Sequence, residues 1–231
     1  MSKRILAFFL TALILLCTAG CGEESASDIL GGKVEDYSGE EAIGDIDSAT
    51  VISSMTLTVT ALTVNSIDLP EFSSPSEIVG TCRDAILNHM LATDYSRFSS
   101  NTKLLSEISQ QYPDMTVTAA IGIKDYESAV YQLFGYSGTV RHSETKRFGY
   151  LSKVTAYVPI APAVSNNVAL DIQSAIETEH TYQMSFFAML EDESSPLYTA
   201  LFIKKDDGMY LQSLSKGKGE KVNVSLDTTI S

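Results

Sequence analysis

The stretch "PLYTALFIKKDDGMYLQSL", residues 196–214, decides the fold class more than any other part of the chain. Both of its halves are rich in apolar and aromatic residues, which favour strands. Between the halves stands "DDG", and Asp-Gly is typical of short hairpin turns because glycine tolerates a positive φ. We therefore predict an antiparallel β-hairpin that turns at Asp207-Gly208.

More strands are predicted before this hairpin, and one after it. They are "TVRHSET" (139–145), "RFGYLSKVTAYVPI" (147–160), "TYQMSFFAMLE" (181–191) and a last one over Lys221–Leu226. The segment "APAVSNNVALDIQSAIETEH" (161–180) is interpreted as a loop with a short helix over Ala169–Ile176. A long insertion between strands is often functional, so this segment is of interest.

The first half of the chain favours helices. In "FSSPSEIVGTCRDAILNHML" (72–91), Ser74 can cap a helix, Pro75 fits its first turn and Glu77 completes a capping box. One apolar face then recurs at three- and four-residue spacings, formed by Ile78, Cys82, Ala85, Ile86, His89 and Met90. Two further helices are predicted, over Lys103–Gln111 and Asp125–Phe134.

Two other segments are interpreted as strands. In "SSMTLTVTALTV" (53–64), Met55, Leu57 and Val59 alternate with threonines, which is the period of a half-buried strand. "MTVTAAIGI" (115–123) is interpreted as a short strand, with a helix as the competing interpretation. The order of helices first and long antiparallel strands later predicts an α+β fold, with helices packed on a curved, mostly antiparallel sheet. We expect one domain over 49–231, with its core at about 76–214.

This layout resembles the nuclear transport factor 2-like, cone-shaped α+β fold. The similarity rests on the helix at Pro75–Met90, the helix around Asp125–Phe134 and the ending "LFIKKDDGMYLQSL" (201–214). The predicted strand at 51–64 and the insertion at 161–180 depart from that family's pattern. The resemblance implies a curved sheet with a concave face, but it carries over no catalytic residue.

The N-terminus resembles the signal peptide of bacterial lipoproteins. Lys3 and Arg4 precede an apolar stretch over Ile5–Leu16, which is shorter than the roughly 20 residues of a spanning helix. The small residues at 18–20 then lead into Cys21, as in a lipobox. The resemblance implies that residues 1–20 are removed and that Cys21 carries lipid, which would anchor the protein extracytoplasmically to the bacterial cell membrane. An ordinary signal peptide cut nearby is the alternative.

Residues 21–48 follow as a linker rich in Gly, Ser and acidic residues, which we expect to be flexible and disordered. The chain has a formal net charge of −13, and removal of Lys3 and Arg4 would make it −15. Such a surface repels phosphate backbones, so the sequence argues against nucleic acid as a partner. If Cys17 leaves and Cys21 is lipidated, Cys82 remains as a lone cysteine, interpreted as a buried hydrophobe.

The sequence indicates no catalytic residues, no metal site and no cofactor. The three histidines that follow the signal peptide, His89, His142 and His180, have no metal-type spacing. The best local cluster is "ETEH" with Glu177, Glu179 and His180, although on a strand His180 would point away from both acids. His89 is interpreted as a core histidine.

One candidate ligand pocket comes from the aromatic residues of the strand half, because alternate strand residues share a concave face. Its predicted lining is Tyr150, Tyr157, Tyr182, Phe186, Tyr198 and Tyr210, and packing in the core is the other interpretation. We therefore expect a lipid-anchored lipoprotein that binds or assembles with another envelope protein without enzymatic activity. The alternatives are a domain that binds a small apolar molecule, or an envelope enzyme using His142 or His180. The oligomeric state is left open.

Overall fold

In the computed structural model, the structure describes Tyr37 and residues 40–217. The chain divides into two units, residues 1–35 and 36–231, and every described residue belongs to the second. The predicted signal peptide, Cys21, most of the linker and the predicted strand over Lys221–Leu226 lie outside the described residues. None of the helices in the described ranges is long and apolar enough to cross a membrane.

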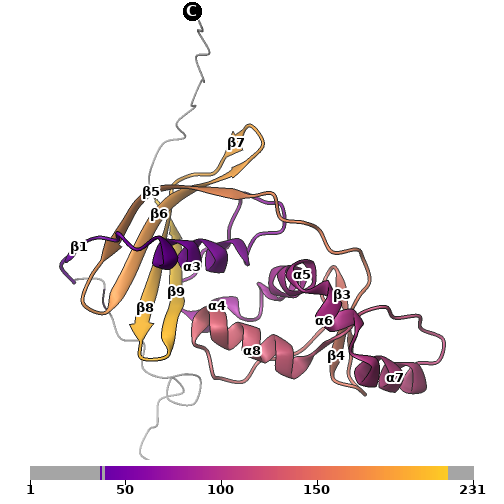
Figure 1. Cartoon of the computed structure of the whole chain (residues 1–231). Helices are drawn as coiled ribbons and strands as arrows, with labels where there is room; N and C mark the ends of the chain where they lie inside the picture. Colours follow the sequence, from indigo (N-terminus) through magenta and orange to yellow (C-terminus); the bar gives the residue numbers. More distant parts are fainter. Residues whose placement is uncertain (1–36, 38–39, 218–231) are drawn as a thin grey trace, which may run out of the picture. The chain divides into compact units, whose positions relative to one another are not determined.

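A six-stranded antiparallel sheet dominates the second half of the described chain (Figure 1). Its main strands are β5 (Ala169–Glu177), β6 (Thr181–Leu190), β8 (Tyr198–Lys205) and β9 (Gly208–Lys216), each paired with the next. Two short strands complete it, β1 (Gly44–Asp45) at the outer edge of β5 and β7 (Glu193–Ser194) beside β6. The predicted hairpin is confirmed, but its turn lies one residue earlier than expected: Lys205 pairs with Gly208, so the turn is Asp206-Asp207 and Gly208 begins β9.

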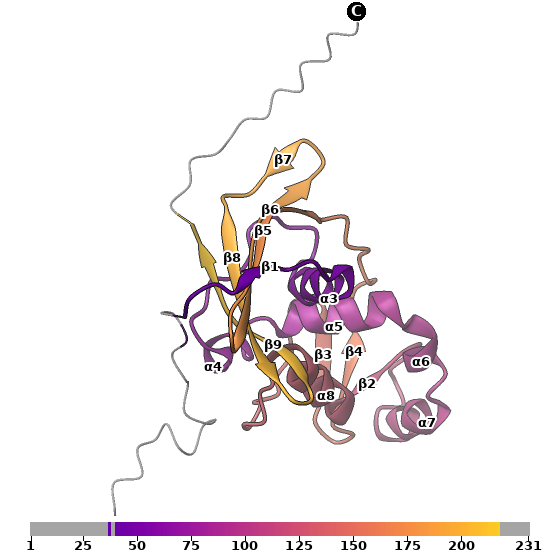
Figure 2. The same ribbon diagram turned by 60° about the vertical axis from the view of Figure 1, so that its left-hand side comes forward.

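The helices of the described ranges are α3 (Ala49–Thr60), α4 (Pro75–Ile78), α5 (Arg83–Thr93), α6 (Tyr95–Ser99), α7 (Thr102–Gln111) and α8 (Ile123–Phe134). Of these, α3, α4 and α8 contact the long strands and α5 packs against α8. Helix α7 packs in the small separate core described below. Figure 2 shows α3, α5 and α8 on the same side of the long strands. Alternate residues of the strands, such as Phe186 and Phe202, meet Leu87 of α5 and Phe134 of α8 in one buried cluster. This arrangement confirms the predicted α+β class.

Register shifts interrupt two of the long strand pairs. One lies between Ile172 and Ser174 of β5, and the other between Leu201 and Phe202 of β8, opposite β9. Such bulges bend a strand and increase its local twist. In β5 the bulge also changes which side chains face inward, because the alternation shifts by one residue at Gln173.

A second, three-stranded sheet lies beside the helices. Its order is β2 (Ile121–Gly122), β4 (Ala156–Pro159) and β3 (Phe148–Leu151). Ile108 of α7 packs against Leu151, Val154 and Val158 in a small separate core. The predicted strand over 147–160 is thus a hairpin. Its turn includes Thr155 at a positive φ of 48°. Glycine is the usual residue in this conformation, and because position 155 is a threonine, the sequence does not indicate the turn.

The predicted strand at 53–64 is wrong, because this segment forms the helix α3. Met55 and Val59 are fully buried four residues apart, whereas Leu57 is 63% exposed, so the pattern follows one helix face. Ser48 caps the helix, and the Thr56 and Thr58 hydroxyls donate to carbonyls four residues back. These bonds satisfy the threonine side chains within the helix.

Three other expectations need correction. The expected short helix over Ala169–Ile176 is the strand β5. The predicted strand at 139–145 is an irregular loop, held by side-chain contacts that are described below. The single helix predicted over Pro75–Met90 is divided into α4 and α5 by a turn over Val79–Cys82.

The predicted helices at Lys103–Gln111 and Asp125–Phe134 are confirmed as α7 and α8. Residues 115–120 form no strand, and the strand predicted there is reduced to the two residues of β2. The linker predicted up to residue 48 ends earlier, because β1 already pairs with β5.

Candidate functional site

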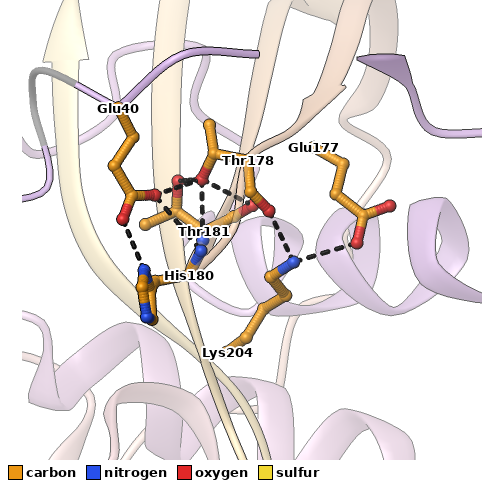
Figure 3. Close-up of polar contacts among 6 residues, drawn as sticks. All are labelled: Glu40, Glu177, Thr178, His180, Thr181 and Lys204. Carbon is orange, nitrogen blue, oxygen red and sulfur yellow. Dashed lines mark hydrogen bonds and ion pairs between the residues drawn. The ribbon is translucent and has the colours of Figure 1, made fainter. Parts of the chain in front are cut away.

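A polar cluster fastens the N-terminal segment to the end of the β5–β6 hairpin (Figure 3). The carboxylate of Glu40 accepts hydrogen bonds at both oxygens. Its Oε1 lies 2.6 Å from Nδ1 of His180, and its Oε2 accepts from the Thr178 hydroxyl at 2.5 Å and from the His180 backbone N–H at 3.2 Å. The ring of Tyr37 stacks on the His180 ring with centroids 5.3 Å apart. We call Tyr37, Glu40, Thr178 and His180 the N-terminal latch.

The turn that carries the latch is itself well braced. The Thr178 hydroxyl lies 2.7 Å from the Thr181 hydroxyl and accepts from the Thr181 backbone N–H. Lys204 of β8 donates to the carbonyl of Thr178 at 2.6 Å and to Glu177 at 2.9 Å. Its ammonium also lies over the Tyr182 ring. The turn therefore presents fixed hydrogen-bond donors, the Thr178 hydroxyl and the His180 backbone N–H, to the Glu40 carboxylate.

The electrostatics of the latch favour ionised Glu40. The Thr178 hydroxyl, followed by the His180 side chain and backbone N–H, holds the pKa of the Glu40 carboxyl below its ordinary value of 4.5. Burial opposes this shift only in part. Because both oxygens of the carboxylate are occupied by protein donors, the cluster is suited to holding two segments together.

A second histidine network lies below the irregular loop at 137–146. His142 stands between two partners, with Nδ1 at 2.9 Å from the Tyr157 hydroxyl and Nε2 at 3.1 Å from Oε1 of Glu127. Burial raises the pKa of Tyr157 to about 12, so its hydroxyl stays protonated near neutral pH. The imidazole thus links Glu127 to the Tyr157 hydroxyl in one hydrogen-bonded chain.

The chain from Glu127 through His142 to Tyr157 resembles an acid–base relay, but its Tyr157 end lies in the buried core. Tyr157 is fully buried, and Tyr126 and Tyr150 pack around the same imidazole. Buried Arg83 donates to Ser143 at 2.7 Å and to the carbonyl of Arg141, which fixes the loop that carries His142. The arrangement explains how residues 139–145 are held without a strand partner.

A cavity of about 310 Å³ lies between α5, α6 and α8. Its polar wall includes His89, Asp94, Arg97 and Asp125. A second cavity of about 300 Å³ shares His89 and Thr93 with the first. His89 is half-buried at the wall between them and is not the core histidine that the sequence predicted.

The six aromatic residues predicted to line a pocket lie in two sheets. Tyr150 and Tyr157 face each other on β3 and β4, with ring centroids 5.2 Å apart. Phe186 of β6 stacks on Tyr198 of β8 at 5.9 Å, and both are fully buried. Tyr182 lies under Lys204, and Tyr210 packs beside Tyr131. The two cavities described above are lined by other residues.

Of the four latch residues, the sequence pattern indicates only His180. It singled out Glu177, Glu179 and His180 as the best local cluster, and His180 and Glu177 do bind polar partners. It missed Glu40, which precedes His180 by 140 positions and lies in a run of similar acids. Cys82 is buried as predicted, and burial raises the pKa of its thiol to about 12. Within the described ranges, no group of three or more His, Cys, Asp or Glu residues is placed to hold a metal ion.

Comparisons with known proteins add no relative: no family model, no curated protein and no solved structure matches the chain. The resemblances to the lipoprotein signal peptide and to the nuclear transport factor 2-like fold therefore stay predictions. The structure defines an α+β domain whose N-terminal segment is latched to the end of its main sheet.

Proposed function

We propose that this protein is a lipoprotein, anchored extracytoplasmically to the bacterial cell membrane through lipid on Cys21, and that its domain binds another envelope protein. The anchor is supported by the order of Lys3-Arg4, apolar stretch, small residues and Cys21. The acidic linker after Cys21 leads directly into the N-terminal latch. The domain is thereby attached to the linker at one defined point, as a tethered binding module requires.

The open edge of β5 is the observation that supports protein binding. β1 pairs with only Ile176 and Glu177, so among the described strands none pairs with residues 169–174 on the side away from β6. An unpaired edge offers backbone N–H and C=O groups to an incoming strand. Its exposed side chains, Ala169, Asp171 and Gln173, include a single charge. We propose that an extended segment of the partner adds to this edge.

Lipidation is tested by metabolic labelling of the full chain with an alkyne analogue of palmitate. We expect the wild-type protein to take up the label and to sediment with membranes. The Cys21→Ser variant should remain unlabelled, whereas Cys82→Ser, which changes the buried thiol, should label normally. Equal labelling of wild type and Cys21→Ser would refute the anchor.

The binding edge is tested separately by photo-crosslinking in cells. A benzophenone amino acid replaces Asp171 on the open edge or, as a control, Lys205 at the exposed end of β8. We expect one repeatable protein adduct from position 171, mapped by mass spectrometry to an extended segment of the partner, and no such adduct from position 205. If both positions capture the same proteins, or if neither captures any, the edge is not the binding surface.

A further inference from the structure

The cavity between α5, α6 and α8 has an apolar floor. α5 packs against both other helices, and the three lie together in both views (Figures 1 and 2). Ile86 and Met90 of α5, Phe98 of α6 and Leu133 of α8 line it. Its volume of about 310 Å³ falls at the lower end of the range for small-molecule sites. The floor therefore suits the hydrocarbon body of a small organic molecule.

The charged groups around this cavity are unbalanced. Asp94 and Asp125 contribute two carboxylates and Arg97 one guanidinium. Arg97 is already paired with Asp125, with Nη2 2.5 Å from Oδ1, and it lies over the Phe98 ring. Asp94 has no cationic side chain as a partner in the described chain; its Oδ1 accepts only from the Arg97 backbone N–H and the Ser96 hydroxyl. One negative charge is left at the cavity.

His89 adds a neutral acceptor at the same place. Its ring makes no hydrogen bond to any described residue, and burial lowers the pKa of the imidazole below 6.5. The ring is therefore uncharged at neutral pH, so it does not oppose a cation and can accept a hydrogen bond from one. The net charge of −13 further favours the approach of cations over anions.

From this combination we propose that the cavity binds a small organic cation, a protonated amine with an apolar body. The hydrocarbon part contacts Ile86, Met90, Phe98 and Leu133, and the ammonium group is held by Asp94 and His89. This site does not involve the β5 edge, so its test does not depend on whether the protein-binding proposal is correct.

The test uses three probes of similar shape that differ in charge. They are 2-phenylethylamine, which is cationic at pH 7, 2-phenylethanol, which is neutral, and 3-phenylpropanoate, which is anionic. Each is titrated into the full chain in a non-ionic detergent by isothermal calorimetry, with detergent alone as the blank. We expect the amine to bind about tenfold more tightly than the other two, as a charged hydrogen bond allows.

A matched pair of variants locates the charge. Asp94→Asn removes the carboxylate but keeps a residue that caps α6 equally well. Glu193→Gln makes the same change of charge at an exposed position on β7. We expect Asp94→Asn to weaken amine binding about tenfold and Glu193→Gln to change it less than twofold. Ala129→Phe, which fills the cavity, should abolish binding of all three probes.

Several outcomes overturn the proposal. One is equal affinity for amine and alcohol, and another is the absence of saturable binding at millimolar amine. Loss of affinity in Glu193→Gln as large as in Asp94→Asn would mean a diffuse charge effect and no site. If Ala129→Phe fails to fold by circular dichroism, the comparison of Asp94→Asn with Glu193→Gln decides alone.

Discussion

The side chain of Asn88 pairs with the backbone of Val164 as a strand residue would. Nδ2 donates to the Val164 carbonyl and Oδ1 accepts from the Val164 N–H, both at 2.9 Å. Asn88 is buried in α5, and Val164 lies in the irregular segment that leads into β5. One amide thus attaches a loop without secondary structure to the centre of the helical layer.

Replacing this amide should destabilise the domain. We expect Asn88→Ala to lower the free energy of unfolding by about 2 kcal/mol, because two backbone groups lose their partner. Chemical denaturation of the full chain measures it. Asn167→Ala serves as the control, since the Asn167 side chain makes no hydrogen bond to the described residues. Equal stability of both variants would contradict the role given to Asn88.

The N-terminal latch should release when Glu40 loses its charge. In Glu40→Gln we expect faster hydrogen exchange at the amides of Ile43 and Ile46, which donate to the backbone of β5. The measurement is hydrogen exchange read by mass spectrometry at near-neutral pH. Glu41→Gln, an exposed neighbour, is the matched control and should exchange like the wild type. If both variants exchange alike, Glu40 does not hold the segment.

Acid should have the same effect as Glu40→Gln. The pKa of Glu40 is lower in the folded protein than its ordinary 4.5, so the ionised form is favoured by folding. Its stabilisation is complete above the unfolded pKa and is lost as the pH falls below about 4.5 through the folded pKa. The backbone amide resonance of His180 should follow this titration by NMR. In Glu40→Gln the titration should disappear.

Gly135 and Tyr210 meet where α8 ends. Gly135 has a φ of 62°, and a Cβ there would lie 2.9 Å from Cγ of Tyr210. We expect Gly135→Ala to cost about 1–3 kcal/mol of stability, from backbone strain and displacement of the tyrosine ring. Thermal unfolding measures the loss. Gly80→Ala, with open space around the added Cβ, should unfold near the wild-type temperature.

The thiol of Cys82 should be inert in the folded chain. It is 5% exposed, and burial raises its pKa to about 12, so little thiolate forms at pH 8. In a Cys17→Ser/Cys21→Ser double variant it is the single thiol. We expect alkylation by iodoacetamide on the order of a hundredfold slower than in denaturant, as local opening limits access. Similar rates in both conditions would show that the site is open.

The fold was predictable wherever one period persists through a whole element. In β6 and β8, Met184, Phe186, Tyr198 and Phe202 keep a period of two, and the sequence shows it. In β5 the bulge at Gln173 breaks that period, which led to the helix interpretation. In α3, the alternation of apolar residues and threonines fits the two-residue period of a strand as well as the roughly 3.6-residue period of a helix. Burial of Met55 and Val59, with Leu57 exposed, decides for the helix, and only tertiary contacts reveal that.

The latch and the cavity were less predictable, for a different reason. His180 was singled out because it stands near acids in sequence, but its partner Glu40 comes from the far end of the domain. The cavity brings together Asp94, the N-cap of α6, and Asp125 of α8, and no local pattern marks either residue. Such sites form from residues that are far apart in the sequence. The spacing of apolar residues within one helix or strand does not predict those contacts.

If the chain is anchored at Cys21, the two-residue strand β1 would carry any force that the anchor transmits to the domain. A force pulling on that anchor would reach the described domain through the latch and then through β1, which pairs with β5 over only two residues. The hydrogen bonds of this pairing and the latch would yield before α3 is disturbed. Once detached, residues 40–48 would span up to about 30 Å when fully extended, while the helices and long strands stay folded. The latch and β1 would thus detach first, and the rest of the domain would stay folded under the same force.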